Sequence, residues 1–556
     1  MKLADLRSRW TGAGVAVAVL VLAAGVLWAM SAGARSARAD TASAVACAPA
    51  TNVTIDSGPV CGLTVNSINE WLGIPYAAPP VGALRWQPPQ PPAAWTTTLQ
   101  ATAFGSSCTQ SFGTPSLIGS EDCLFVNVWR PADSTAGLPV LVHIHGGGFV
   151  FGSGNGDNTL LSSTGHEVVV SMNYRLGIFG FLADRALGPN SGDYGLQDQQ
   201  AALRWVQRNI AQFGGDPANV TIYGESAGGS SVCDEIASPT AARLFERGIS
   251  VSGEYNTLLG SPTSLEAQDC KSRLPSRAQS FAAGANFASA VGCGPGTADV
   301  ATCLRNVSAS AAQAAAGGGV VGGFYPVGYQ DGGQGTVGPT INGTTLPRSL
   351  RDALERGRVN RVDVIEGTDR DENLVGTAST AAQYTALIDT QYGAFASQVL
   401  ARYPLSRFDS PGVAWRTVAA DSDTVCPALS LGEELASRMP TREYEIDDND
   451  LPPYRAAGPN VVAAGASHVG GWFVTPTATP LDANQQVLQD QELAFVTSFA
   501  RNGDADASAM PRWPRLGRDG EVMSLQPADD SALISQEQMA QQHNCAFWDR
   551  VARAAS

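Results

Sequence analysis

The serine in Gly224-Glu225-Ser226-Ala227-Gly228 constrains the fold more than any other feature of the chain, because of what surrounds it. The β-branched run Val220–Tyr223 precedes it, and small residues that can begin a helix follow. A strand that passes directly into a helix needs a sharp turn, in which side chains at the glycine positions would collide with neighbouring backbone. The sequence therefore predicts that Ser226 projects from the carboxyl end of a strand. A serine in an ordinary tight turn is the alternative.

Other short apolar runs predict further strands of the same kind. Each is β-branched and is followed by loop residues, as buried parallel strands are. They are Leu138–Ile144, Val168–Ser171 and Val362–Ile365. Apolar residues at helical spacing over Gly195–Phe213 predict a helix between two of these strands. We therefore expect an α/β fold in which helices cover both faces of a mostly parallel central sheet.

Two long stretches lack strong strand runs and are rich in alanine, serine and glycine. They span about 255 to 345 and 380 to 440. We expect them to be helical excursions that form the walls of an active site at the carboxyl edge of the sheet. The preference for one substrate over another would depend on these walls.

The first forty residues predict export. Basic residues precede an apolar run over 12–30, and Ala37-Arg38-Ala39 follows as a small-x-small cleavage site. We expect residues 1–39 to be a signal peptide, which leaves 40–556 as the single domain of a secreted protein. The alternative is an uncleaved anchor that holds the protein at the outer face of the cell membrane, because the run is nearly long enough to span a bilayer.

Cysteine content indicates the cellular compartment, and net charge indicates which binding partners are unfavourable. The ten cysteines form no CxxC pair and lie far from four of the five histidines, so they favour disulfides over a zinc site. The net charge is −16, with lysine only at Lys2 and Lys271. Such a surface repels the phosphates of nucleic acids and anionic lipids. We therefore expect no nucleic-acid partner, no membrane partner for the mature chain and no metal.

A second glycine-rich segment follows the run Leu138–Ile144. It reads His145-Gly146-Gly147-Gly148-Phe149. Acyl transfer places negative charge on a carbonyl oxygen, and backbone N–H groups aimed at that oxygen stabilise it. Consecutive glycines let the backbone come close to the substrate. We expect Gly147, Gly148 and Ala227 to form this oxyanion hole, whereas a flexible glycine turn is the alternative.

A serine nucleophile needs a base, and the chain offers only five histidines. Four stand in places that favour other roles: His143 within a strand run, His145 at the start of the glycine loop, His166 before a strand and His543 in the C-terminal tail beside Cys545. His468 lies in a loop of small residues far downstream of Ser226. We therefore expect His468 to be the base.

The third catalytic group should be a carboxylate between Ser226 and His468, at the end of a strand. The run Val362–Ile365 ends beside several acidic residues. They are Glu366, Asp369, Asp371 and Glu372. Spacing alone does not choose among them, and most are expected to be ordinary solvated or salt-bridged carboxylates.

Several segments, in the same order, resemble the type-B carboxylesterase family. They are Gly73-Ile74-Pro75-Tyr76-Ala77, Glu121-Asp122-Cys123-Leu124, Asn173-Tyr174-Arg175-Leu176-Gly177, Phe213-Gly214-Gly215-Asp216-Pro217 and Gly224-Glu225-Ser226-Ala227-Gly228-Gly229. The resemblance covers nearly the whole mature chain and implies the α/β-hydrolase fold. It also implies that Glu372 is the catalytic acid and His468 the catalytic base. We further expect Glu225 and Ser252 to support these groups from behind.

The resemblance also implies disulfides. The family's two short loops and its long-range bridge correspond to Cys108–Cys123, Cys293–Cys303 and Cys426–Cys545. The pairs Cys47–Cys61 and Cys233–Cys270 then follow by elimination.

Two departures from the family pattern affect the expected chemistry. Gly471 stands where the family usually has an acidic residue after the catalytic histidine, and Trp472 follows it. The tuning of the histidine is therefore expected to differ. Phe112 is the only aromatic residue in the loop closed by Cys108 and Cys123, where cholinesterases carry a tryptophan that binds choline. Choline esters are therefore not expected as preferred substrates.

Together these features predict a serine carboxylic-ester hydrolase that acts on small to medium carboxylic esters through an acyl-enzyme. Its partners would be the ester and water, with no cofactor. A lipase or sterol esterase for long-chain esters is one alternative. A non-catalytic binding or adhesion protein of the same fold is another, although such a protein would usually lack the serine or the histidine.

Overall fold

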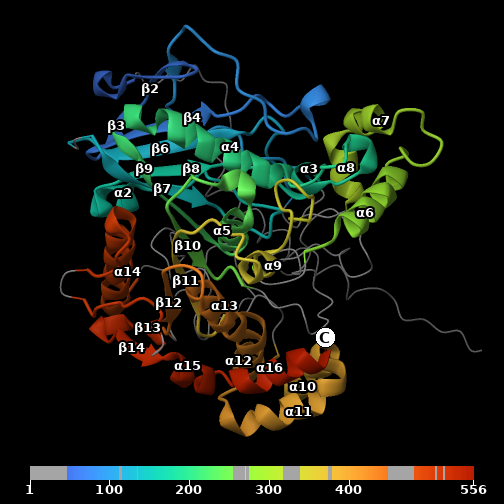
Figure 1. Ribbon diagram of the computed structural model, residues 1–556, viewed down its shortest axis with the longest axis vertical. Coiled ribbons are helices and arrows are strands. Elements are labelled where there is room, and N and C mark those ends of the chain that lie inside the picture. Colours follow the sequence, from blue (N-terminus) through green and yellow to red (C-terminus); the bar gives the residue numbers. More distant parts are fainter. Residues whose placement is uncertain are drawn as a thin grey trace, which may run out of the picture. The chain divides into compact units, whose positions relative to one another are not determined.

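The apolar runs of the sequence form strands at the centre of the structure, which is a computed structural model (Figure 1). It describes residues 47–111, 116–133, 136–254, 270, 274–316, 338–372, 378–448, 481–507, 510–517 and 520–555. Within these ranges an 11-stranded sheet has the order β14-β13-β12-β11-β10-β9-β7-β8-β6-β4-β3. Its strands are β3 (Leu63–Val65), β4 (Ile68–Pro75), β6 (Phe125–Pro131), β7 (Leu138–Ile144), β8 (Val168–Met172), β9 (Gly215–Glu225), β10 (Arg247–Val251), β11 (Asp363–Asp369), β12 (Thr441–Ile446), β13 (Glu521–Leu525) and β14 (Ala532–Ser535).

The middle of this sheet is parallel. Every neighbouring pair from β8 through β7, β9, β10, β11 and β12 to β13 is parallel, whereas the pairs nearer the two edges are antiparallel. A separate small sheet contains β1 (Val53–Ile55), β2 (Gly58–Cys61) and β5 (Leu99–Gln100). The predicted, mostly parallel central sheet is confirmed, and β7, β8, β9 and β11 lie on the four apolar runs.

Alternate residues along each strand serve two different cores, because successive side chains of a strand point to opposite faces. Val140 and Val142 of β7 pack in one core, and Leu141 between them packs in the other. The first core also contains residues of α4 (Tyr194–Asn209), α5 (Ala227–Ala237), α9 (Leu350–Glu355) and α13 (Cys426–Ala436). The second contains residues of α2 (Thr159–Gly165) and α14 (Ala483–Asn502). Helices therefore cover both faces, as predicted (Figure 1).

The described parts of the two excursions contain helices and no strands. The first includes α6 (Arg277–Ala290), α7 (Val300–Asn306) and α8 (Ala309–Ala315). These pack with α3 (Gly177–Phe181) around the buried Trp86. The second includes α10 (Ala381–Tyr392), α11 (Ala396–Arg402) and α12 (Pro411–Ala420), which a π-helical turn, η9 (Asp421–Val425), joins to α13.

The C-terminal elements return to both sides of the sheet. Asp482 caps α14 by accepting hydrogen bonds from the backbone N–H groups of Asn484 and Gln485. The chain ends in α15 (Gln536–Gln542) and α16 (Cys545–Ala555), and α16 packs with α10, α11 and α12 (Figure 1). Among the helices that the structure describes, none has the length and apolar character needed to cross a bilayer.

Candidate active site

Ser226 occupies the turn between β9 and α5 in a strained backbone conformation. Its φ is 56° and its ψ is −124°, values that a residue with a side chain adopts only when its surroundings enforce them. The backbone N–H of Ser226 donates to Val251 O at 2.9 Å. A Cβ on Gly228 would lie 2.1 Å from Ile144 O, so the turn closes only with glycine there. The sequence prediction of a sharp strand–serine–helix turn is confirmed.

The glycine loop after β7 lies against this turn. Gly147 and Gly148 have φ values of 104° and 62°, which favour glycine. A Cβ on Gly146 would lie 3.3 Å from Ser226 Cβ and 2.5 Å from Glu225 O. Ala227, the third expected donor, is buried at the start of α5. The three predicted oxyanion residues therefore come from two segments that touch beside Ser226.

The register of the sheet brings the acidic loop to the same edge as Ser226. Glu225 of β9, Val251 of β10 and Gly367 of β11 are aligned across the three strands. Ser226 follows the first of these, and Glu372 lies five residues beyond the last. The Glu372 carboxylate is buried, and Thr368 Oγ1 donates to its Oε2 at 2.9 Å.

The other acidic residues of this segment have different surroundings. Glu366 lies within β11, beside Ser250 and Glu443 of the adjacent strands, and burial raises its pKa to about 8 against a hydrogen bond with Ser250. Asp371 is next to Glu372, and burial raises its pKa while nearby cations lower it. Asp369 is the last residue of β11. Glu372 differs from Glu366 in its place, since it lies beyond the end of β11 and Glu366 lies within the strand.

The base, His468, lies outside the described residues, as do Gly471, Trp472 and Phe112. Its assignment therefore remains a prediction. The other histidines have positions that suit different roles. Burial lowers the pKa of His143 to about 3, and its ring stacks on Tyr223 at 4.9 Å. His166 ends α2 with φ 53°.

His145 supports the glycine loop. Its ring stacks on Tyr174 at 4.3 Å, and its Nδ1 lies 2.8 Å from Gly146 O. Tyr174 Oη donates to His145 O at 2.8 Å. Burial lowers the pKa of His145 to about 4, so the ring is neutral and Nδ1 donates its proton to the carbonyl. The structural role that the sequence favours for His145 agrees with these contacts.

His543 pairs with two buried carboxylates, which the sequence did not predict. Its Nδ1 lies 2.6 Å from Asp421 Oδ1, and its Nε2 lies 2.6 Å from Glu445 Oε1. All three side chains are buried. In the sequence these residues are far apart, and only the position of His543 beside Cys545 indicated an ordered tail.

Glu225 and Ser252 lie behind the serine turn. A Cβ on Gly146 would lie 2.8 Å from Glu225 Oε2, so this carboxylate packs against the glycine loop. Ser252 has a φ of 45°, and its N–H donates to Gly367 O at 2.8 Å, which ties the end of β10 to β11. Their positions suit the supporting role expected from the sequence, which remains a prediction.

The disulfides of the structure are the five expected pairs. They are Cys47–Cys61, Cys108–Cys123, Cys233–Cys270, Cys293–Cys303 and Cys426–Cys545. Disulfides of this number are typical of proteins outside the reducing cytosol.

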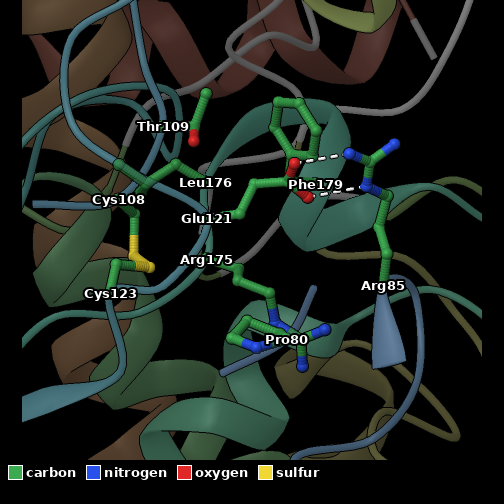
Figure 2. A pocket seen from close by; sticks show the side chains of 9 residues that line it. All are labelled: Pro80, Arg85, Cys108, Thr109, Glu121, Cys123, Arg175, Leu176 and Phe179. Atoms are coloured by element: carbon green, nitrogen blue, oxygen red, sulfur yellow. Dashed lines mark hydrogen bonds and ion pairs between the residues drawn. A yellow bond between two sulfur atoms is a disulfide. The ribbon is translucent and has the colours of Figure 1, made fainter. Parts of the chain in front are cut away.

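A small pocket lies beside the Cys108–Cys123 disulfide (Figure 2). Its lining consists of Pro80, Arg85, Cys108, Thr109, Glu121, Cys123, Arg175, Leu176 and Phe179. Figure 2 shows the Arg85 guanidinium facing the Glu121 carboxylate, with two charge-assisted hydrogen bonds between them. Arg175 pairs in the same way with the buried Asp198. Arg85 and Arg175 both already pair with carboxylates. Their positive charge is therefore compensated, and the pocket is not suited to bind an anion.

Comparison with known proteins decides the family. The model of the carboxylesterase family matches residues 49–548. The chain belongs to the carboxylesterase family. The fumonisin B1 esterase of Sphingopyxis macrogoltabida is 32% identical over 84% of this chain and 85% of its own length. The para-nitrobenzyl esterase of Bacillus subtilis is 38% identical, over 58% of this chain and 62% of that protein.

Solved structures agree with this carboxylesterase assignment. A para-nitrobenzyl esterase structure matches with a TM-score of 0.67 and 27% identity, covering 89% of this chain and 99% of that one. A thermophilic para-nitrobenzyl esterase matches with a TM-score of 0.69 at the same identity, covering all of its chain. The fold is therefore the α/β-hydrolase fold, and the protein is a serine carboxylic-ester hydrolase.

Proposed function

We propose that Ser226, His468 and Glu372 hydrolyse esters through an acyl-enzyme. The observation that carries this proposal is the strained backbone of Ser226, at a turn that touches the glycine loop. Ser226 Oγ attacks the ester carbonyl while His468 takes the hydroxyl proton. Glu372 orients His468 and stabilises the imidazolium that forms.

The N–H groups of Gly147, Gly148 and Ala227 stabilise the negative oxygen of the tetrahedral intermediate. The alcohol leaves with the proton that His468 returns to it. Water then attacks the acyl-enzyme by the same route, which releases the acid and restores Ser226. Every proton in this cycle moves between Ser226, His468 and the reactants, so the cycle needs no cofactor.

We propose small to medium carboxylic esters as the substrates. Support comes from relatives whose names specify para-nitrobenzyl and fumonisin esters. The test is hydrolysis of p-nitrophenyl esters from acetate to palmitate by the protein that starts at Asp40. Highest kcat/KM on short chains is expected, whereas a maximum on emulsified palmitate would make the protein a lipase.

The same assay tests the nucleophile. Ser226→Ala is expected to lower kcat by roughly a million-fold, because the covalent route is lost. The exposed Ser163 of α2 provides the matched control, and Ser163→Ala is expected to keep wild-type activity. A Ser226→Ala protein with wild-type activity would disprove the assignment.

We also propose that residues 1–39 direct export and that 40–556 is the mature single-domain enzyme. Two observations support this proposal: the compact unit begins at Cys47, and the five disulfides suit an oxidising compartment. Mass spectrometry of the exported protein tests it. A first residue at Asp40 is expected, whereas an intact N-terminus in the membrane fraction would indicate an uncleaved anchor.

A further inference from the structure

His543 forms a buried charged cluster that the proposed reaction does not use. The histidine lies between α15 and α16, and its two ring nitrogens each lie 2.6 Å from a carboxylate oxygen. Asp421 comes from the π-helical turn η9, and Glu445 comes from β12. Tyr403 Oη donates to the second oxygen of Asp421 at 2.7 Å. Nδ1 is therefore hydrogen-bonded to Asp421, and Nε2 lies at ion-pair distance from Glu445.

The geometry makes this ring a cation. Burial by itself lowers the pKa of His543, but the charge of Asp421 and hydrogen bonds to Asp421 and Glu445 raise it to about 10. A carboxylate oxygen lies within 2.6 Å of each ring nitrogen, an arrangement that favours the doubly protonated ring. The ring thus lies between the buried carboxyl groups of Asp421 and Glu445.

Polar residues lie between this cluster and the catalytic acid. Glu445 of β12 is aligned with Thr368 of β11 in the parallel register. Thr368 Oγ1 donates to Glu372 Oε2 at 2.9 Å. Glu445 and Thr368 are therefore cross-strand neighbours that lie between the His543 cluster and Glu372. Glu372 is the group that would orient His468.

The acid turn, residues 370–372, lies near the His543 cluster as well. Asp371 directly precedes Glu372, and the charge of His543 lowers the pKa of Asp371 against the larger effect of burial, as do Arg370 and Arg416. The turn η9, which supplies Asp421, packs against both β11 and α16. The carboxylates around His543 are thus Asp421 from η9, Glu445 from β12 and Asp371 from the acid turn.

We propose that His543 is a positioning residue for the catalytic acid, whose imidazolium holds Glu445 and the acid turn in place from the C-terminal side. The inference rests on the proposed role of Glu372. Without the imidazolium, Asp421, Glu445 and Asp371 would lose the cation that they share, and only Arg370 and Arg416 would remain to offset the charge of Asp371. The carboxyl groups would rearrange, and the acid turn would move with Asp371.

A neutral variant tests this proposal through the chemistry of the catalytic histidine. In His543→Gln we expect kcat on p-nitrophenyl butyrate to fall about tenfold with KM within about twofold, because a misplaced acid weakens the chemical step. The acidic limb of the pH profile of kcat/KM should move to lower pH, because Glu372 would stabilise the His468 cation less well. A purely structural role would leave that limb unchanged.

Glu445→Gln provides a second route if His543→Gln does not fold. It keeps the Asp421–His543 pair and removes only the carboxylate beside Nε2 of His543. The same fall in kcat and the same shift of the acidic limb are expected. As a matched control, Arg442→Gln removes a different buried cation of β12, which pairs with Asp504 at 2.7 Å. This control should lose thermal stability but keep the wild-type kcat and pH profile.

Glu372→Gln distinguishes failure of the catalytic role of Glu372 from failure of the positioning role of His543. If Glu372→Gln loses activity while folded His543→Gln and Glu445→Gln keep the wild-type kcat and pH profile, the positioning role of His543 is wrong and the proposed mechanism stands. If Glu372→Gln itself keeps full activity, the acid is misassigned and the role of His543 is wrong with it.

Discussion

At the scale of single residues, the active site depends on backbone positions as much as on reactive side chains. Ser226 has a left-handed φ, and glycines surround it where a Cβ would meet main-chain atoms. The glycine loop approaches so closely that Gly146 lies against both Glu225 and Ser226. Backbone strain of this kind is retained when the surrounding structure determines it, and it presents the hydroxyl to the substrate.

Gly228→Ala tests this dependence on backbone. The added methyl group would lie 2.1 Å from Ile144 O, so α5 or the end of β7 must move. We expect kcat to fall at least about a hundredfold, because displacement of about 1 Å is enough for such a loss. Steady-state kinetics would measure the effect.

Gly156→Ala is the matched control for this prediction. Gly156 is exposed, and no atom lies within 4 Å of the Cβ position. The activity of Gly156→Ala should equal that of the wild type. Equal activity of Gly228→Ala would show that the turn tolerates a side chain and that its geometry is not essential.

At the scale of elements, the parallel strands carry polar groups inside the sheet as well as at its edge. Ser250, Glu366 and Glu443 are aligned across β10, β11 and β12, and all three are buried. Gln536 Nε2 donates to Glu443 Oε2 at 3.0 Å. Burial raises the pKa of Glu443 as well as that of Glu366, so protonated carboxyl groups suit this row.

Glu366→Gln should therefore alter how stability depends on pH. The folded chain binds the Glu366 proton more tightly than the unfolded chain, since the pKa is about 8 rather than 4.5. The stabilisation is present below about pH 4.5 and is lost as the pH rises toward 8. The glutamine has no proton to lose. The free energy of unfolding of Glu366→Gln minus that of the wild type should therefore be larger at pH 9 than at pH 5, by at least about 1.4 kcal/mol.

Denaturant unfolding at the two pH values would measure this difference, with the exposed Glu355→Gln as control. The control should show no such dependence. A Glu366→Gln effect of the same size at pH 5 and pH 9 would contradict the buried, protonated state of Glu366.

At the scale of the whole molecule, disulfides fix segments that the sheet does not hold. Cys426–Cys545 joins the start of α13 to the start of α16 over 119 residues, whereas Cys293–Cys303 spans only 10. The long bridge lies beside the His543 cluster, since His543 and Cys545 are two residues apart. It therefore anchors the tail from which His543 reaches Asp421 and Glu445.

Removal of the long bridge should destabilise the chain more than removal of the short one. In the chain-entropy model the difference between loops of these lengths is about 2 kcal/mol. We expect the double variant Cys426→Ser/Cys545→Ser to have a lower Tm than Cys293→Ser/Cys303→Ser in calorimetry. Equal Tm values would show that the stabilisation does not follow the length of the closed loop.

Sequence predicted those parts of the molecule where local pattern and tertiary role agree. The runs that became β7, β8, β9 and β11 are rich in β-branched and other apolar residues, and the serine turn combines a strand with obligatory glycines. By contrast, β12 was not predicted, because its buried residues Arg442, Glu443 and Glu445 conceal the strand pattern.

Local sequence pattern was likewise insufficient to predict all the contacts of the candidate site. Spacing left four acids open, because only the folded chain shows that Glu366 lies within β11 whereas Glu372 lies beyond its end, where Thr368 donates to it. His543 lies 98 positions from Glu445 and 122 positions from Asp421 in the sequence, yet it pairs with both. No local pattern in the sequence marks such a contact.

Covalent labelling of Ser226 is the most direct test of the proposed mechanism. A p-nitrophenyl phosphonate should transfer one phosphonyl group to each active chain, and activity should fall in proportion. Peptide mapping by mass spectrometry should place the group on Ser226. Complete loss of activity with Ser226 unmodified, or with the label on another residue, would contradict the account.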